Sequence, residues 1–309
     1  MTSPRIQLAS DVLIDIAMLL ATRAGVAANS GAGKSWILRL IAEQTTPHVP
    51  VLVFDGEGEF ATLRERCDMV LVGSGGEVDT TIATSAKLMR KLIEMRLSAV
   101  VDMSDLSKPE RQEYVKRSLE SILSAPRRLW GPMLVIIDEC QDYAPESGDP
   151  VSKPAVIDLS CKSRKHGIGC AYATQRLSKI SKDAMGEANN LLIGRFAQDV
   201  DLRRASDLLG FSGKSEWATI RDGKPGEFFA VGPAFVHTGV KRFKCDKVTT
   251  THARAGSRAM EPPKPSRAIL KVAPELADLK RQVEEEKSEL DSLRAEVKQL
   301  RAKRPIPVA

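Results

Sequence analysis

The sequence of 309 residues predicts an α/β protein, in which a mainly parallel β-sheet is flanked by helices and followed by a C-terminal coiled-coil helix. Three observations lead to this prediction. Short apolar runs alternate with segments of helical period, as buried parallel strands alternate with helices. A glycine-rich turn joins a strand to a helix within the stretch from Val26 to Leu40. A heptad repeat occupies the last part of the chain.

The predicted strands are short runs of aliphatic residues, of which Met133 to Ile137 is the most apolar. They lie at residues 6–8, 51–54, 69–72, 99–103, 133–137, 169–173 and 191–196. Apolar residues with helical spacing predict helices at residues 11–22, 83–96, 109–123, 157–165 and 199–209. A terminal hairpin is expected to join residues 227–231 and 235–240 around Gly232 and Pro233.

The glycine-rich turn has the chemistry of a phosphate-binding loop. It consists of Asn29, Ser30, Gly31, Ala32, Gly33, Lys34 and Ser35. Its glycines let backbone N–H groups surround a phosphate chain, and the following helix adds the positive end of its dipole. Lys34 is expected to reach the β- and γ-phosphates of ATP, and the Ser35 hydroxyl to bind Mg²⁺. One position departs from the usual pattern, because Ala28 stands where a P-loop has glycine. The alternative is an ordinary solvated loop.

Two carboxylates follow the most apolar strand. Asp138 is expected to hold Mg²⁺, and Glu139 to polarise the water that attacks the γ-phosphorus. An acidic turn after a strand is the simpler alternative. The phosphate loop upstream favours the catalytic interpretation.

Five stretches together resemble one family. They are the phosphate loop, FDGEGEF at 54–60, VIIDECQDYAPE at 135–146, SRKHGIG at 163–169 and ATQR at 173–176. The chain resembles the HerA/FtsK-type motor ATPases over about residues 5–240, and is most similar to the central domain of HerA. The resemblance implies a RecA-like P-loop NTPase without the N-terminal barrel of HerA.

The resemblance also implies roles for two further residues. Gln175 resembles the polar sensor of the γ-phosphate or attacking water, and Arg164 resembles an arginine finger that reaches the nucleotide of a neighbouring subunit. A solvated strand-end glutamine and a solvated basic face are the alternatives. Arg195 is a second candidate for the finger. Glu57 and Glu59 are candidates to tune the metal or water, and capping of the next helix is the equal alternative for them.

The net charge of +6 does not spread over the whole chain. Residues 241–271 hold nine basic and two acidic residues, so the rest of the chain is close to neutral. For a DNA track we therefore look to a few cations after the sensor strand, namely Arg176, Lys179 and Lys182. An ordinary solvated loop is the alternative. The five cysteines form no C-x-x-C pair, and no apolar run is long enough to span a bilayer, so a cytoplasmic protein is expected.

The predicted organisation has three parts. Residues 1–240 form the ATPase domain, 241–274 a basic, proline-containing linker, and 275–304 a coiled-coil helix. The heptad places Leu276, Val283, Leu290 and Val297 at position a and Leu279, Glu286, Leu293 and Leu300 at position d. This helix is expected to act as an adaptor, pairing with a copy of itself or with a foreign protein such as a nuclease or another DNA-processing factor.

The expected function is that of an ATP-hydrolysing, ring-forming motor, hexameric by its resemblance, that moves double-stranded DNA. One alternative is a packaging or conjugation ATPase of a phage or plasmid. Another is a nucleotide-dependent scaffold that recruits a partner through its coiled coil.

Overall fold

The computed structural model describes residues 3–252 and 262–303. Nine strands form one sheet in the order β11-β10-β9-β3-β8-β7-β4-β6-β5, in which the seven strands from β9 to β5 are parallel. The strands of this sheet are β3 (Ala24–Ala27), β4 (Val51–Asp55), β5 (Met69–Val72), β6 (Ser98–Asp102), β7 (Met133–Ile137), β8 (Ile168–Thr174), β9 (Asn190–Ile193), β10 (Glu227–Val231) and β11 (Lys241–Lys244). The predicted α/β class, a mainly parallel sheet flanked by helices and followed by a long C-terminal helix, is confirmed.

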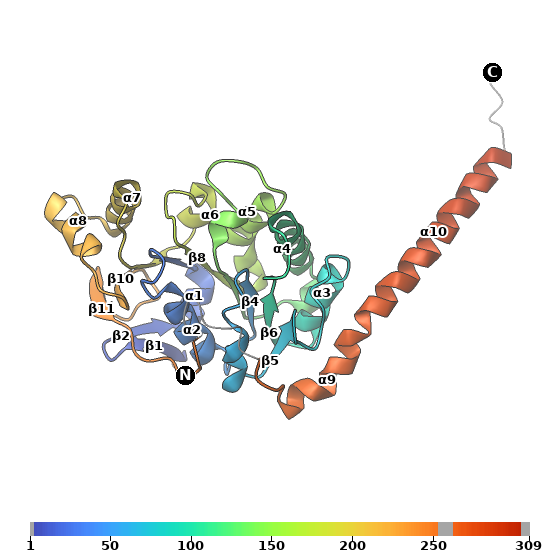
Figure 1. Cartoon of the computed structure of the whole chain (residues 1–309), viewed down its shortest axis with the longest axis horizontal. Coiled ribbons are helices and arrows are strands. Elements are labelled where there is room, and N and C mark those ends of the chain that lie inside the picture. Colours follow the sequence, from blue (N-terminus) through green and yellow to red (C-terminus); the bar gives the residue numbers. More distant parts are fainter. Residues whose placement is uncertain (1–2, 253–261, 304–309) are drawn as a thin grey trace, which may run out of the picture.

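Helices cover both faces of the sheet (Figure 1). One face carries α3 (Ser85–Glu94), α4 (Lys108–Leu123), α5 (Lys153–Lys162), α6 (Lys182–Gly186) and α7 (Asp199–Leu209). The other carries α1 (Ile16–Thr22), α2 (Lys34–Thr45) and the hairpin of β1 (Arg5–Ala9) and β2 (Val12–Asp15). Strand side chains alternate between these two cores: Leu52 and Phe54 enter the first, Val51 and Val53 the second. A further helix, α8 (Lys214–Arg221), follows α7, and short 3-10 helices lie at residues 61–65, 127–129, 140–142 and 163–166.

The first predicted helix was partly wrong. Residues 12–15 form strand β2, which pairs antiparallel with β1, and α1 begins only at Ile16. The side chain of Asp15 caps this helix by accepting the Met18 N–H at 2.9 Å. Val12 and Ile14 alternate with half-exposed residues, which is the burial pattern of a strand.

The predicted terminal hairpin was also wrong in its second strand. β10 pairs with β11 at Lys241–Lys244, and residues 235–240 do not form its partner. Phe235 instead makes a bridge to Ile14 of β2 and is buried in the core on that side. Burial of this aromatic ring against the β1–β2 hairpin outweighs local strand pairing.

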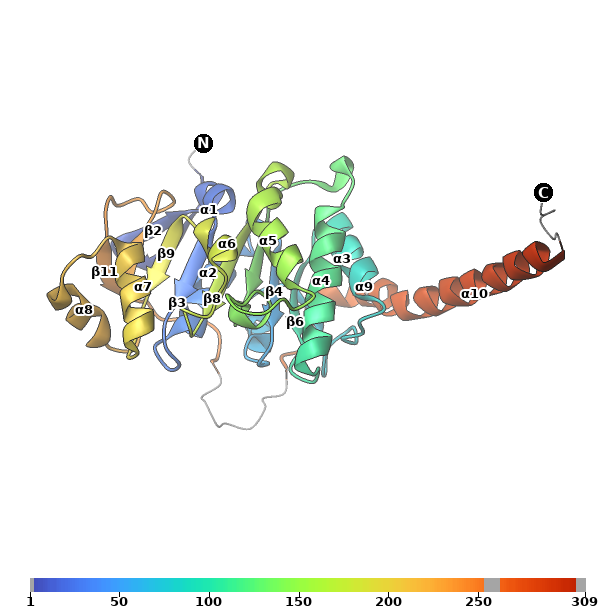
Figure 2. The same ribbon diagram turned by 90° about the horizontal axis from the view of Figure 1, so that it is seen from above.

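The range 241–274, expected as a linker, includes folded structure at both ends. β11 occupies residues 241–244, and α9 (Arg267–Ala277) begins seven residues before the range ends. The long helix α10 (Leu279–Lys303) follows α9 and projects away from the body (Figures 1 and 2). Of the heptad residues, the Leu300 side chain lies outside the described part.

Candidate active site

The phosphate loop lies between β3 and α2, as predicted. Gly33 precedes α2 with φ of +104°, and a Cβ there would lie 3.2 Å from the backbone nitrogen of Gly226. Both the left-handed backbone and this close approach require glycine. The loop is tied to neighbouring strands, since Ala28 N–H donates to the Thr174 carbonyl and Asn29 N–H to the Arg195 carbonyl. The turn is therefore fixed by the sheet itself.

The alanine that replaces the first P-loop glycine is accommodated by another glycine. Ala28 is fully buried, and Gly194, just after β9, lies against it. A Cβ at Gly194 would lie 2.7 Å from the Ala28 Cβ, so only one of the two positions can carry a side chain. Ala28 thus fits without displacing the loop.

Four predicted site residues meet at the carboxyl edge of the sheet. Lys34 follows β3, Asp138 and Glu139 follow β7, and Gln175 follows β8. These three strands are parallel neighbours, so their carboxyl ends open side by side. Lys34 Nζ lies 2.6 Å from Asp138 Oδ1 and 2.8 Å from Glu139 Oε1. Gln175 Nε2 donates to Glu139 Oε1 at 2.6 Å.

The charges of this cluster perturb one another. Burial lowers the pKa of Lys34, but the adjacent carboxylates outweigh it and raise the pKa above its ordinary value. Burial raises the pKa of Glu139, but the Lys34 ammonium and donated hydrogen bonds outweigh it, so the net shift is downward. Glu139 is therefore an ionised hydrogen-bond acceptor at neutral pH, which suits a residue that orients and polarises water.

Glu139 is held in an unusual backbone conformation. Its φ is +47°, in the left-handed region that costs free energy for a residue with a side chain. Two side-chain amides fix the carboxylate, because Gln141 donates to Oε2 at 2.6 Å and Gln175 to Oε1. Gln141 in turn accepts from the Thr174 hydroxyl at 2.6 Å.

Gln141 and Thr174 were missed at the sequence level. Each lies next to a predicted residue, two positions after Glu139 and one before Gln175. The available signal was a polar residue one or two positions away from a predicted catalytic residue. This signal could be interpreted only by knowing that β7 and β8 are neighbouring strands.

A second buried carboxylate, Asp55, ends β4 beside β7. It accepts backbone N–H groups from Glu57, Gly58 and Phe60 and so fixes the loop at residues 56–60. Burial, together with the charges of Asp102 and Asp138, raises the pKa of Asp55 to about 7. Within the loop, Glu57 lies 3.9 Å from the Arg111 guanidinium. Glu59 lies just before the 3-10 helix at residues 61–65, and the first turn of that helix contains no acidic residue.

Arg164 lies at the opposite edge of the sheet. It is exposed on the 3-10 helix at residues 163–166, which Gly167 joins to β8. The seven residues of β8 separate it from Gln175, a distance of roughly 20 Å along the strand. Arg164 is thus placed away from the phosphate loop of its own chain. The other candidate, Arg195, is half-buried and follows β9 at the same edge as the loop.

The three cations predicted to contact DNA lie together after β8, but two are already paired. Arg176 Nε lies 3.4 Å from the buried Asp201 carboxylate, and Lys182 Nζ lies 2.9 Å from Glu146. Lys179 is exposed.

The residues fit a magnesium ion bound with nucleotide. Among the described residues no group of three or more His, Cys, Asp or Glu side chains could hold a metal by itself. One carboxylate, Asp138, and one hydroxyl, Ser35, suit Mg²⁺, which takes few protein ligands and completes its shell with phosphates and water. Within residues 3–252 and 262–303, no helix is long and apolar enough to cross a membrane.

Residues 6–150 match the family described as "Helicase HerA, central domain". A 114-residue stretch, 37% of this chain, is 26% identical to the DNA double-strand break repair helicase HerA of Pyrococcus furiosus. The match spans only 20% of that relative's length.

Solved structures share the fold at low identity. The genome packaging NTPase B204 of Sulfolobus turreted icosahedral virus 2, in complex with ATP-gammaS, has a TM-score of 0.51 at 14% identity, covering 72% of this chain and 97% of its own. VirB4 of Thermoanaerobacter pseudethanolicus has a TM-score of 0.55 at 15% identity, covering 80% and 96%. The bacterial conjugative coupling protein TrwB has a TM-score of 0.57 at 12% identity, covering 80% and 89%.

The fold and the clustered Lys34, Asp138 and Glu139 define a P-loop NTPase. The match over residues 6–150 is to the same family that the motifs resemble, the central domain of helicase HerA.

Proposed function

We propose that the chain is an ATP-hydrolysing motor that assembles into a hexameric ring and moves along double-stranded DNA in the cytoplasm. One observation supports this proposal: the residues predicted to take part in ATP hydrolysis lie at opposite edges of the sheet. Lys34, Glu139 and Gln175 gather at the carboxyl edge, whereas Arg164 is exposed at the amino edge. A head-to-tail ring brings one edge against the other and completes a site at each interface.

Within one subunit, nucleotide binding begins with an exchange of partners. A phosphate chain bound by residues 29–35 competes with Asp138 and Glu139 for the Lys34 ammonium. Once Lys34 binds the phosphates, the Glu139 carboxylate becomes available to accept a hydrogen bond from the attacking water. Bound Mg²⁺ supplies charge neutralisation at the phosphates, with Ser35 and Asp138 as its protein ligands.

Gln175 is the residue that senses the γ-phosphate in this scheme. In the structure, the Gln175 side chain donates to Glu139. The next residue is Arg176, whose backbone N–H donates to the Thr174 hydroxyl at 3.1 Å. A change of partner at Gln175 therefore acts on the segment that carries Arg176, Lys179 and Lys182. We assign these cations to the DNA phosphate backbone, which a ring can bind with few charges per subunit.

Arg164 supplies the finger in trans. Its guanidinium is permanently charged and exposed, and it is separated by the length of β8 from its own phosphate loop. Across a ring interface it stabilises the charge that develops on the neighbour's γ-phosphate.

A packaging or conjugation motor is a second candidate. It is favoured by the fold shared with a genome packaging NTPase and a conjugative coupling protein. Both candidates predict stimulation by duplex DNA, whereas a nucleotide-dependent scaffold does not.

The deciding experiment measures ATP hydrolysis with and without duplex DNA of increasing length. We expect stimulation that grows with duplex length, because a longer track permits more steps before release. Lys34→Ala should lose tight nucleotide binding and all activity above background. Glu139→Gln should retain nucleotide affinity and lose turnover by roughly a hundredfold or more.

Two results would contradict the proposal. Nucleotide binding without any effect of duplex DNA would favour the scaffold. Turnover of Glu139→Gln at the parental rate would show that another residue polarises the water.

A further inference from the structure

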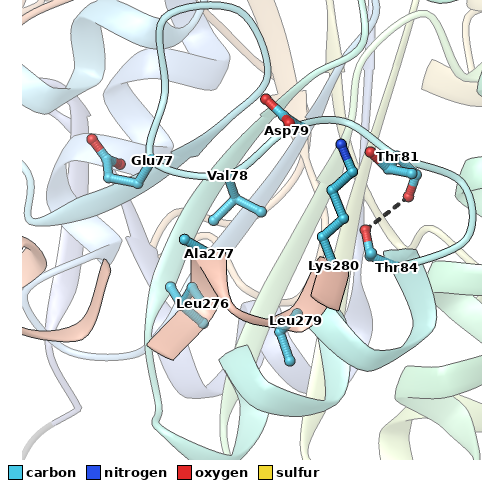
Figure 3. Close-up of a pocket in the computed structure, with 9 residues that line it drawn as sticks. All are labelled: Glu77, Val78, Asp79, Thr81, Thr84, Leu276, Ala277, Leu279 and Lys280. Atoms are coloured by element: carbon cyan, nitrogen blue, oxygen red, sulfur yellow. Dashed lines mark hydrogen bonds between the residues drawn. The ribbon is translucent and has the colours of Figure 1, made fainter. Parts of the chain in front are cut away.

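The C-terminal tail, defined as α9 and α10, has a docked part and a free part. Ile269, Leu276 and Leu279 are almost fully buried and join the hydrophobic core beneath α3 and α4. Where the two helices meet, Ala277 and Lys280 line a small pocket of about 90 Å³ against residues 77–84 (Figure 3). The side chain of Lys280 extends along this pocket between Asp79 and Thr81 (Figure 3). The first a and d residues of the heptad are therefore used to attach the tail to its own body.

Two ion pairs extend this attachment into the second heptad. Glu275 pairs with Lys91, and Glu286 pairs with Lys87, both on α3. Glu286 is the residue that interrupts the predicted seam at position d. Its contact with α3 explains the interruption, because this heptad faces the body of the protein.

Beyond Glu286 the apolar stripe is exposed. Leu290, Leu293 and Val297 are 48%, 51% and 47% exposed, and they follow one another at helical a and d spacing. The helix continues for about 25 Å past Glu286 and projects away from the body (Figures 1 and 2). A polar helix with one such stripe gains stability by burying it against another helix.

The charged residues beside the exposed apolar stripe indicate which kind of helix can pair with it. Position e carries Lys287 and Arg294, and position g carries Glu289 and Glu296. In a parallel two-stranded coiled coil, each g residue lies beside the e residue five positions later in the partner. Glu289 of one copy then faces Arg294 of the other. The sequence repeats the spacing at Glu296 and Arg301.

We propose that the free part of α10 pairs with the same segment of a second copy of this chain, parallel and in register. In an antiparallel pair, g faces g and e faces e, so glutamates would meet glutamates and cations would meet cations. The stripe and its flanking charges are complementary to themselves only in the parallel arrangement. The subunits of a ring point their tails in one direction, which satisfies this requirement, although the pairing itself does not depend on DNA translocation.

Cysteine crosslinking of the full-length, nucleotide-free protein tests the orientation. Leu290→Cys and Val297→Cys are introduced separately into a Cys161→Ala background, because Cys161 is the exposed native thiol among the described residues. Both variants should form disulfide-linked dimers under mild oxidation. Ser292→Cys, on the opposite side of the same helix, is the matched control and should not.

Crosslinking at only one of the two positions would indicate an antiparallel pair and overturn the proposal, because an antiparallel pair can bring only one position opposite itself. Absence of crosslinking at both positions would overturn it as well, and would leave a foreign helix as the occupant.

Charge exchange tests the register independently. Glu289→Arg and Arg294→Glu should each lower the crosslinking yield of Leu290→Cys by roughly three- to tenfold, because each places like charges across the seam. The double variant should restore the yield. Failure of the double variant to recover, with helix content unchanged by circular dichroism, would contradict the pairing of these two positions. ATPase activity of each variant should match the parent, so failure of the tail pairing is distinguishable from failure of the motor.

Discussion

Lys34 bridges two carboxylates, and one ammonium cannot neutralise both. Asp138 is buried more deeply than Glu139, and burial raises the pKa of Asp138, whereas the Lys34 ammonium and donated hydrogen bonds lower the pKa of Glu139, so an ionised carboxylate lies next to the phosphate loop. This arrangement gives nucleotide binding an electrostatic cost unless a cation accompanies the phosphates. We propose that this cost is the physical reason for the Mg²⁺ dependence expected from the sequence.

Asp55 predicts a pH dependence of stability at the same edge. Its pKa of about 7 is far above its ordinary value near 3.8, so between these limits the folded state holds a proton that the unfolded chain has lost. Stability therefore falls as pH rises through this window and stays low above it. Relative to Asp55→Asn, the wild-type protein should lose up to roughly 3 kcal/mol of unfolding free energy between pH 5 and pH 8.

Urea unfolding of both proteins at several pH values measures this difference. Asp105→Asn, at an exposed position, controls for removal of one carboxylate. A wild-type minus Asp55→Asn difference that is flat from pH 5 to pH 8 would show that Asp55 is ionised throughout.

At the scale of elements, the sequence was informative wherever a pattern is local. The strand, turn and helix around Lys34 and the apolar strand before Asp138 could each be read from contiguous residues. By contrast, a contact distant in sequence shapes the end of the sheet: β11 pairs with β10 across a nine-residue loop, and Phe235 within that loop bridges to Ile14 of β2. The accommodation of Ala28 by Gly194 likewise required knowing that β3 and β9 are neighbours.

The placement of Arg164 on the short helix before β8 predicts complementation between two inactive variants. Arg164→Ala should abolish ATP hydrolysis while leaving nucleotide affinity nearly intact, because the residue lies away from its own phosphate loop. Mixed with Glu139→Gln, it should regain activity, because one interface in a mixed ring then combines an intact Glu139 with an intact Arg164. Titration of the two variants at constant total protein, with the ATPase rate recorded, measures the effect.

Lys165→Ala is the matched control, since Lys165 is the exposed neighbouring cation on the same short helix. It should retain activity. A mixture of the Arg164 and Glu139 variants that stays inactive at every ratio would argue against catalysis in trans.

At the scale of the whole molecule, the segment that follows β11 stabilises the α/β body by binding to helix α2. Residues 245–252, which we call the strap, cross the outer side of α2. Thr249 and Thr250 bind the Glu43 carboxylate through both backbone and hydroxyl, and Trp36 donates to the Asp246 carbonyl at 2.8 Å. Thr250 also accepts from Arg39, whose side chain is fully buried. The folded α/β body therefore includes residues beyond 240, where the sequence analysis expected the first domain to end.

Truncation should separate the structural strap from the free end of the tail. A chain ending at Lys287 keeps β11, the strap and the docked helix α9, and removes only the exposed stripe. We expect it to fold, to hydrolyse ATP at the parental rate and to lose crosslinkable tail pairing. A chain ending at Val240 loses β11 and leaves Arg39 without its Thr250 partner, so it should be destabilised by at least a few kcal/mol. Thermal unfolding and ATPase assays on the two proteins measure both effects. If the chain ending at Lys287 is folded but cannot assemble or hydrolyse ATP, the free part of α10 is required to build the motor, and its role as a separate adaptor is wrong.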